Sequence, residues 1–452
     1  QLNENTRFNE KLNCFETGLL WRKSPKGILP SNLNKAISVM KRVEKSLSAE
    51  NKILMDQSIS DLIQNDFAEE IPLKDINADY FHYLECFPVI KPERLTTKCR
   101  IVFNASAKSK NNPISLNSLL LTGPNVIGSI PAILVRFRLN KIASILDMSK
   151  MFYRIRLYRE EDLNSLRFIY RKSGEENYKH YRFKSLMMGL TCSPFLSIKI
   201  LLRHAEKLIN ENDDNIELKN ALEAFIKGIY MDDVPLSMNQ SDEMISTLKI
   251  IYKFLKNCGM KPHKIISSSE TVQEEWPLEL DFNPDKTAVL GTRWNFLDDT
   301  LGIQVPKIND TLDKPTKRIV LKTLAGVFTA DGLISPFIFK GKLLLKKIWE
   351  RKCDWDDPLD KDLTELYIEW SSQLKDLQNL KINRYLGGTP ESVYYLACFG
   401  DASTEGYACS IYLVIKNKEA STSNIIFSKT RIAPQKMLES KKCKNKSTYI
   451  AR

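Results

Sequence analysis

Two adjacent carboxylates near the middle of the chain, Asp232 and Asp233, constrain its fold more than any other feature. Short apolar runs flank them, 224–230 before and 234–238 after, and this pattern predicts a β-hairpin with the acids at its turn. Adjacent carboxylates in a tight turn repel each other, and a divalent cation held by their oxygens would offset the repulsion. A solvated Asp-Asp turn is the alternative interpretation, and the turn alone does not decide between the two.

A third acid is available at the end of another predicted strand. Asp147 directly follows the apolar run 142–146. Together with the hairpin acids it gives three carboxylates that are able to converge on two metal ions, an arrangement that polarises a phosphate and activates a hydroxyl. Taken alone, Asp147 is better explained as a helix N-cap, because Asp after a strand often begins a helix.

The charge balance favours a polyanionic partner. The 452 residues carry a formal net charge of +12 and are 43% hydrophobic, which indicates a basic globular protein. Solubility is the alternative reason for such a charge. The nine cysteines form no CxxC pair, so we expect reduced thiols in a cytosolic or nuclear protein instead of disulfides or a zinc site. Four scattered histidines argue against a His-rich metal centre.

The sequence lacks the patterns of a membrane or secreted protein. It has no apolar run of about 18 residues and no signal-peptide pattern at its start. It opens with Gln and stops in a Lys-rich tail, which we interpret as a fragment of a longer protein or a degraded reading frame.

Hydrophobic periodicity predicts a mixed chain. Expected helices cover much of 31–70, including 55–65, and also 193–208, 243–257 and most of 316–380. Expected strands are 87–90, 99–103, 142–146, 168–171, 181–183, 289–296, 393–399 and 407–415.

A series of motifs in a fixed order resembles the reverse transcriptases of LTR retrotransposons, most closely the BEL/Pao group. Any one of these motifs is weak, but this many in the right order is a strong signal. The matching stretches are Lys91-Pro92 with 97–106 for the fingers, 115–117 with 120–124, then 136–138 before 147–152, 188–190 with 193–195 and 230–233 for the palm, Gly259 with Lys264 and Ser267, 290–294, and 324–332 with 335–336.

The resemblance implies an α+β fold. This is a right-hand polymerase with fingers, palm and thumb and an antiparallel palm sheet, followed by a helical connection and a truncated RNase H-like α/β segment. The corresponding regions are a helical N-terminal extension over 1–75, fingers and palm over 76–300, a mainly helical thumb or connection over 301–386, and the RNase H-like segment over 387–452.

The same resemblance implies roles in catalysis. Asp147, Asp232 and Asp233 would hold two Mg²⁺ ions, or Mn²⁺ in their place, with Asp233 as the least direct ligand. Lys264 would lie near the leaving pyrophosphate, where an ammonium acts as a charge or proton donor. Tyr230 would touch the primer end.

Nucleotide-binding roles follow in the same way. Arg100, together with Lys98, would hold the triphosphate, since a planar Arg fork suits phosphate. Phe152 would exclude a 2′-hydroxyl by its bulk, and Met188 and Gly189 would pack near the base and sugar. Each of these residues also has a plain structural interpretation. Arg100 and Lys264 would be surface charges, and Phe152 and Met188 would be residues of the hydrophobic core.

The C-terminal region resembles the opening of a retroelement RNase H domain. The stretches 400–403, 406–408 and 428–434 carry this likeness. RNase H chemistry needs several carboxylates around two metals, and only Asp401 is in place. Glu439 follows at too short a spacing to supply the next acid, so we predict that the chain has no RNase H activity.

The resemblance implies an RNA-directed DNA polymerase, a nucleotidyltransferase that is part of a retrotransposon polyprotein. Its partners would be an RNA or DNA template–primer, deoxynucleoside triphosphates, and precursor or capsid proteins, in a cytoplasmic retroelement particle and the nucleus. The lysines within 340–347 are a candidate template–primer contact, or a solvated helix face.

Four positions depart from the family pattern. They are Asn104, the stretch 85–87, Met188 and Pro235. Proline removes a ladder donor from a strand and belongs at sheet edges. None of the four removes a predicted metal ligand. These departures leave open an alternative, an inactive relic of the same fold with residual nucleic-acid binding. A basic structural protein with coincidental acids is disfavoured by the order of the motifs.

Overall fold

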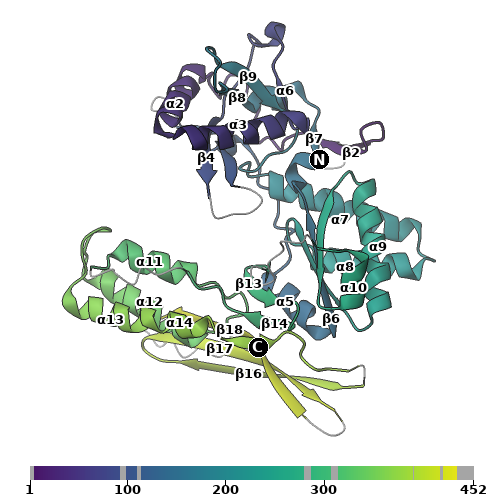
Figure 1. The fold of residues 1–452 in the computed structure, drawn as a ribbon, viewed down its shortest axis with the longest axis vertical. Coiled ribbons are helices and arrows are strands. Elements are labelled where there is room, and N and C mark those ends of the chain that lie inside the picture. Colours follow the sequence, from purple (N-terminus) through teal and green to yellow (C-terminus); the bar gives the residue numbers. More distant parts are fainter. Residues whose placement is uncertain are drawn as a thin grey trace. The chain divides into compact units, whose positions relative to one another are not determined.

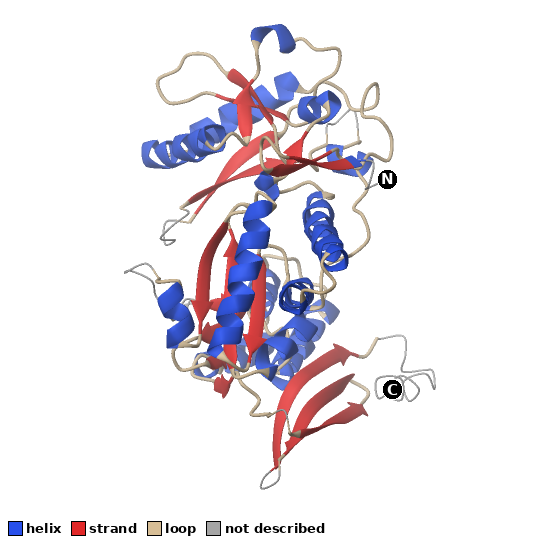
Figure 2. Ribbon diagram, turned by 90° about the vertical axis from the view of Figure 1, so that its right-hand side faces the viewer, coloured by secondary structure: helices blue, strands red, loops and turns tan. Residues whose placement is uncertain are grey.

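The computed structural model describes residues 5–91, 98–108, 113–278, 287–306, 314–389, 391–417 and 421–434. Pro92 and Thr97 of the fingers motif and Glu439 lie outside these residues. The chain forms two compact units, and each draws on separate stretches of sequence (Figure 1). The first comprises 1–127, 148–226 and 249–263, and the second 128–147, 227–248 and 264–452. Both mix helices with strands, as the predicted α+β class requires (Figure 2).

Three small sheets organise the first unit. They have the strand orders β1-β2-β7, β3-β9-β8 and β4-β5. The N-terminal 75 residues, predicted to be helical, also contain β1 and β2. The strands are β1 (Thr6–Asn9), β2 (Cys14–Thr17), β3 (Ala68–Glu70), β4 (Glu85–Ile90), β5 (Cys99–Asn104), β7 (Arg156–Leu157), β8 (Arg167–Tyr170) and β9 (Lys179–Phe183).

The helices of the first unit begin with an amphipathic helix, α2, which a second helix, α3, follows near the N-terminus. The long helix α7 starts with Ser193-Pro194, as its start signal predicts. In order they are α2 (Leu33–Ser46), α3 (Ala49–Gln64), η1 (Leu73–Asp75), α4 (Leu116–Leu119), η2 (Met151–Arg154), α6 (Glu160–Ser165) and α7 (Ser193–Glu211). Helices α8 (Ile216–Gly228) and α9 (Ser241–Asn257) each contain residues assigned to both units.

A buried acid fastens the N-terminal segment to α6. Asp162 is fully buried, and its two carboxylate oxygens accept hydrogen bonds from the Leu19 backbone N–H and the Trp21 indole, at 2.9 and 2.7 Å. Burial raises the pKa of Asp162 to about 6, and the two hydrogen bonds oppose this rise. The folded unit therefore binds a proton more tightly than the unfolded chain does.

This raised pKa predicts how stability depends on pH. An acid whose pKa is higher in the folded state loses stability as the pH rises from its ordinary value, about 4, to its folded value. Relative to Asp162→Asn, the parent should lose about 3 kcal/mol of unfolding free energy between pH 4 and pH 7. Urea denaturation across this range measures the difference. Glu161→Gln is the neighbouring control, and a parent–variant difference that stays constant with pH would contradict the prediction.

The second unit contains the predicted palm sheet. Its order is β10-β6-β11, with β6 (Ile142–Met148) between β10 (Asp233–Met238) and β11 (Pro262–Ser267). Helix α5 (Ile130–Leu139) leads directly into β6, and the short helix α10 (Glu270–Glu275) follows β11. In an antiparallel sheet with one buried face, hydrophobic residues from the strands meet the covering elements in a common core.

That core joins the palm strands to a second sheet. Trp294 is fully buried at its centre and makes edge contacts with Phe137 and Phe296. Ala143 and Ile145 of β6 belong to the same cluster. The second sheet has the order β12-β13-β14-β15, with β12 (Ala288–Val289), β13 (Thr292–Asn295), β14 (Thr300–Gly302) and β15 (Lys381–Asn383).

The single strand predicted over 289–296 is wrong. The structure instead makes a hairpin of β12 and β13, with Leu290 and Gly291 at the turn at φ of 48° and 86°. Two successive residues with positive φ form the tight turn that matches strand twist, and glycine adopts that conformation without strain.

The rest of the second unit is helical and then antiparallel. The predicted helical region contains α11 (Lys317–Gly326), α12 (Ser335–Glu350), α13 (Lys361–Ser372) and α14 (Leu374–Leu377). A three-stranded sheet follows, with β17 (Gly406–Lys416) between β16 (Val393–Ala402) and β18 (Ser421–Ile432). Within the described residues, no helix is both long and apolar enough to cross a membrane.

Candidate active site

The structure pairs two of the three predicted acids directly. Asp147 near the end of β6 lies opposite Asp233 at the start of β10. Asp233 exchanges both backbone hydrogen bonds with Tyr230, so its N–H and C=O point away from β6. The Asp147–Asp233 pair is therefore of the type without mutual backbone bonds, in which opposite side chains stand closest. Both side chains are half-buried and lie on one face of the sheet.

Asp232 lies at the tip of a tight turn. The Tyr230 N–H donates to Asp233 O at 2.8 Å and the Asp233 N–H donates to Tyr230 O at 3.1 Å, which leaves Met231 and Asp232 as the two loop residues. Met231 has φ of 54°, so the loop contains a residue in the left-handed region. The turn is the one predicted, but the run before it is wrong as a strand, because 216–228 forms the helix α8.

Pro235 fits its position in β10. This strand is at the edge of the palm sheet, and Pro235 lies opposite Ile145 of β6. Alternate residues of a strand direct their backbone groups to the same side, so Pro235, like Asp233, faces away from β6 and removes no bond from the ladder. This departure from the family pattern therefore does not disturb the pairing that carries the acids.

Negative charge accumulates at the pair. Burial, together with the smaller effects of the charges on Asp232 and Asp147, raises the pKa of Asp233 to about 7. Asp232 is exposed. Among the described residues, no three His, Cys, Asp or Glu side chains are arranged as a ready-made metal site. The acids thus form a close pair with an exposed neighbour, a donor set of hard oxygens that fits a divalent cation.

Two further predicted residues lie in the same sheet or turn. Lys264 is half-buried in β11, the strand on the other side of β6 from β10. Tyr230 is half-buried and packs against the core around Trp294. The predicted catalytic residues Asp147, Asp232, Asp233 and Lys264 therefore come from three neighbouring strands and one turn of the second unit.

The predicted nucleotide-binding residues other than Tyr230 belong to the first unit. Arg100 is exposed on β5, opposite Val89 of β4, and Lys98 is exposed just before that strand. Gly189 has φ of 104°, and a β-carbon there would lie 2.9 Å from the carbonyl oxygen of Phe103 on β5. Only glycine allows the loop after Met188 to approach β5 this closely. The exposed Met188 is thus brought to the strand that carries Arg100.

Asn117 organises this loop, a role that sequence reasoning missed. Its side-chain amide donates to Gly189 O at 2.8 Å and to Ser106 Oγ at 2.9 Å. Its side-chain oxygen accepts from the Thr191 N–H at 3.0 Å. In the sequence, Asn117 stands out only as part of the stretch 115–117. Its three contacts follow from side-chain geometry that no local pattern encodes.

Phe152 lies in η2, directly after the chain leaves β6. Lys150 enters that turn with φ of 56°, and Met151 beside Phe152 is buried. The Phe152 side chain itself is half-buried. It belongs to the first unit, whereas Asp147 belongs to the second.

Asp401 stands near the end of the exposed strand β16. Its Oδ1 accepts a hydrogen bond from the Ala402 N–H at 2.8 Å, and its register partner on β17 is Ala408. Among the residues that the structure describes, no three His, Cys, Asp or Glu side chains around Asp401 are grouped so that they could hold a metal ion.

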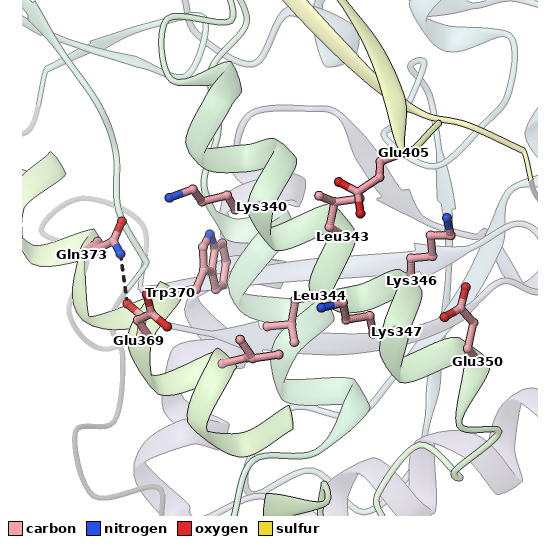
Figure 3. Close-up of a pocket in the computed structure, with 11 residues that line it drawn as sticks. Lys340, Leu343, Leu344, Lys346, Lys347, Glu350, Glu369, Trp370, Gln373 and Glu405 are labelled. Carbon is pink, nitrogen blue, oxygen red and sulfur yellow. Dashed lines mark hydrogen bonds between the residues drawn. The ribbon is translucent and has the colours of Figure 1, made fainter. Parts of the chain in front are cut away.

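The lysines of α12 do not form a uniform cationic face. Lys342 donates to the backbone and hydroxyl of Thr430, at 3.0 and 3.3 Å. Lys340, Lys346 and Lys347 line a cavity of about 420 Å³ between α12 and α13 (Figure 3). Its lining also includes the acids Glu350, Glu369 and Glu405, so charges of both signs share the cavity.

Two protein-family models match the chain. Residues 94–273 match the reverse transcriptase (RNA-dependent DNA polymerase) family, and residues 316–441 match the Pao retrotransposon-like RNaseH-like domain. The first match contains the Asp147–Asp233 pair, and the second contains α11 to α14 and the sheet of β16, β17 and β18. No curated protein sequence matches the chain.

Solved structures share the fold at low sequence identity. A foamy viral protease–reverse transcriptase in complex with double-stranded DNA is 15% identical with a TM-score of 0.53, covering 89% of this chain and 59% of its own. Another, in complex with an RNA/DNA hybrid, is 14% identical with a TM-score of 0.53, covering 90% and 46%. The chain thus spans about half the length of these structures. The predicted polymerase fold is confirmed. The chain combines a match to the reverse transcriptase family over 94–273 with a match to the Pao retrotransposon-like RNaseH-like domain over 316–441.

Proposed function

We propose that the chain is an RNA-directed DNA polymerase of an LTR retrotransposon, which adds deoxynucleotides to a primer 3′ end on an RNA or DNA template. The pairing of Asp147 with Asp233, beside the turn that carries Asp232, is the observation that supports this most. The reverse transcriptase match over 94–273 supports the same chemistry. In this function the sheet β10-β6-β11 carries the reacting centre.

The carboxylates would act as ligands of two Mg²⁺ ions, for which Mn²⁺ could substitute. Such a pair, when bound, polarises the phosphate and stabilises the attacking and leaving oxygens. Asp147 and Asp232 would be the more direct ligands, and Asp233 the least direct. Lys264, in the strand beside β6, presents an ammonium that balances charge on the departing pyrophosphate or donates a proton to it.

The remaining predicted residues bind the substrates. Arg100 and Lys98 hold the triphosphate, Met188 and Gly189 lie at its base and sugar, and Tyr230 contacts the primer end. A template–primer duplex is held through its phosphates, for which the net charge of +12 is suited. The foamy viral structures with bound duplexes support this partner. A retroelement particle in the cytoplasm, with access to the nucleus, is the proposed location.

Primer extension tests the proposal. The full chain is incubated with an RNA template, a DNA primer, four deoxynucleotides and Mg²⁺, and the products are separated by length. We expect elongated primers, and we expect Mn²⁺ to sustain the reaction in place of Mg²⁺. A folded chain that binds the template–primer but extends nothing with either metal would contradict polymerase function and favour an inactive relic.

Sugar selection gives a separate prediction. Phe152→Ala should raise ribonucleotide incorporation relative to deoxynucleotide incorporation by about 100-fold, because a small side chain leaves room for a 2′-hydroxyl. Single-nucleotide kcat/KM values for matched ribo- and deoxynucleotides measure the ratio. Phe152→Tyr retains the bulk and serves as the control. Equal ratios in the parent and the alanine variant would exclude Phe152 as the selecting residue.

A further inference from the structure

Two buried arginines interlock in the second unit. Arg138 is 3% exposed in α5, inside the reverse transcriptase match, and Arg384 is fully buried just after β15, inside the RNaseH-like match. Each guanidinium binds backbone carbonyls of the segment that carries the other. A buried guanidinium has to satisfy its N–H donors within the protein. The hydrogen-bond partners of these two arginines therefore show which segments the contact joins.

Arg384 uses all of its donors. Its guanidinium donates to the carbonyl oxygens of Phe137, Asn140 and Lys141, at 2.6, 2.9 and 2.6 Å. It also forms a two-bond fork with Asp299, at 2.7 and 2.9 Å. A guanidinium has five N–H donors, and each is accounted for by these contacts. A lysine has neither the fork nor the reach to reproduce them.

Arg138 of α5 donates hydrogen bonds to the segment that carries Arg384. It donates to the carbonyl oxygens of Arg384 and Ile425, at 3.2 and 3.1 Å, and more weakly to that of Asn383 at 3.4 Å. Ile425 belongs to β18, so the contact reaches the three-stranded sheet. In return, the backbone N–H of Leu386 donates to Arg138 O at 3.1 Å.

These contacts provide hydrogen-bond donors for the last carbonyl oxygens of α5. The last carbonyls of a helix have no partner within it. Here Arg136 O accepts from the Ser237 hydroxyl of β10, Phe137 O from Arg384 and Arg138 O from the Leu386 N–H. The Arg384 cation also lies at the negative end of the helix dipole. The chain then runs through Asn140 and Lys141, both bound by Arg384, into β6 and so to Asp147.

We propose that Arg138 and Arg384 form an arginine clasp, which makes the region of the RNaseH-like match, 316–441, a structural part of the polymerase palm. Arg384 is then a positioning residue for the strand that carries Asp147. The region acts here through its backbone and Arg384, independently of RNase H chemistry. The link to catalysis rests on the proposed polymerase function, whereas the link to the structure of α5 and β6 does not.

Hydrogen–deuterium exchange of the full chain tests the structural link. Arg384→Ala should speed exchange of the amides in 137–147 by at least ~10-fold, because the helix end loses its partners and can open locally. Arg384→Lys should give an intermediate increase. Arg318→Ala is the matched control, since Arg318 makes the same two-bond fork with Asp356, at 2.7 and 2.9 Å, but on the surface. It should leave 137–147 unchanged.

Steady-state primer extension tests the link to catalysis. A positioning role predicts that Arg384→Lys lowers kcat about 10-fold while KM for the template–primer stays near that of the parent. If Arg384→Ala does not fold, Arg384→Lys and Asp299→Asn supply both readouts. If the Arg384 variants exchange and turn over at the rates of Arg318→Ala, the proposal is overturned. If they exchange faster but keep the kcat of the parent, only the positioning role is overturned. A parent without polymerase activity would refute the proposed function, while exchange would still decide the clasp.

Discussion

Replacing Asp147 or Asp232 with asparagine is expected to lower primer extension by at least ~1,000-fold, equivalent to about 4 kcal/mol of transition-state stabilisation. Asparagine keeps the size of the side chain but removes the charge that holds a divalent cation. Both variants should keep the fold, because Asp232 is exposed and Asp147 is half-buried. The measurement is kcat/KM for a single correct deoxynucleotide, at a Mg²⁺ concentration that saturates the parent.

Asp242→Asn is the matched control for these variants. Asp242 is an exposed acid in the first turn of α9, outside the palm sheet. The Asp242→Asn variant should extend primers at the rate of the parent. Template–primer affinity should also be unchanged within about threefold in all three variants, because phosphates bind mainly to basic groups. Activity of Asp147→Asn within tenfold of the parent would refute its role as a metal ligand.

Replacing Trp294 with alanine is expected to cost the second unit about 3–5 kcal/mol of unfolding free energy. The side chain is fully buried among α5, β6 and the second sheet, and its indole donates to Asp299 at 3.1 Å. Truncation leaves a cavity under the catalytic strand and removes one partner of the carboxylate that binds Arg384. Denaturant unfolding followed by circular dichroism measures the loss.

A second tryptophan provides the comparison. Trp355 is 39% exposed and lies beside Trp349 at the end of α12. Trp355→Ala should cost about 1 kcal/mol or less, because truncating an exposed side chain leaves no sealed cavity. Equal losses for the two variants would mean that the core around Trp294 does not support the second unit.

Local patterns predicted the elements that carry the chemistry. The apolar run 142–146 followed by Asp147 is the strand β6, and the residues 230–233 do form a tight turn. Ser193-Pro194 does begin a helix. These features depend on alternation, caps and turn residues within a few positions of one another, so a single sequence contains the information.

Patterns failed where distant packing overrode a local preference. The run before the Asp-Asp turn is apolar enough for a strand, yet it is the end of α8. The stretch 289–296 divides into two strands because Leu290 and Gly291 both take positive φ. Short apolar runs fit either a buried helix or a strand, and the surrounding core selects between them.

The order of the acids and the motifs around them can be identified in the linear chain alone, and they indicate the families that match 94–273 and 316–441. The tertiary structure decided which groups meet. It set Asp147 opposite Asp233 in one register, and a shift by one residue would have turned one of them to the other face. It also brought Arg138 to the carbonyl of Arg384, 246 positions away. Such contacts depend on how whole elements pack, because no interaction between neighbouring residues specifies a partner so far along the chain.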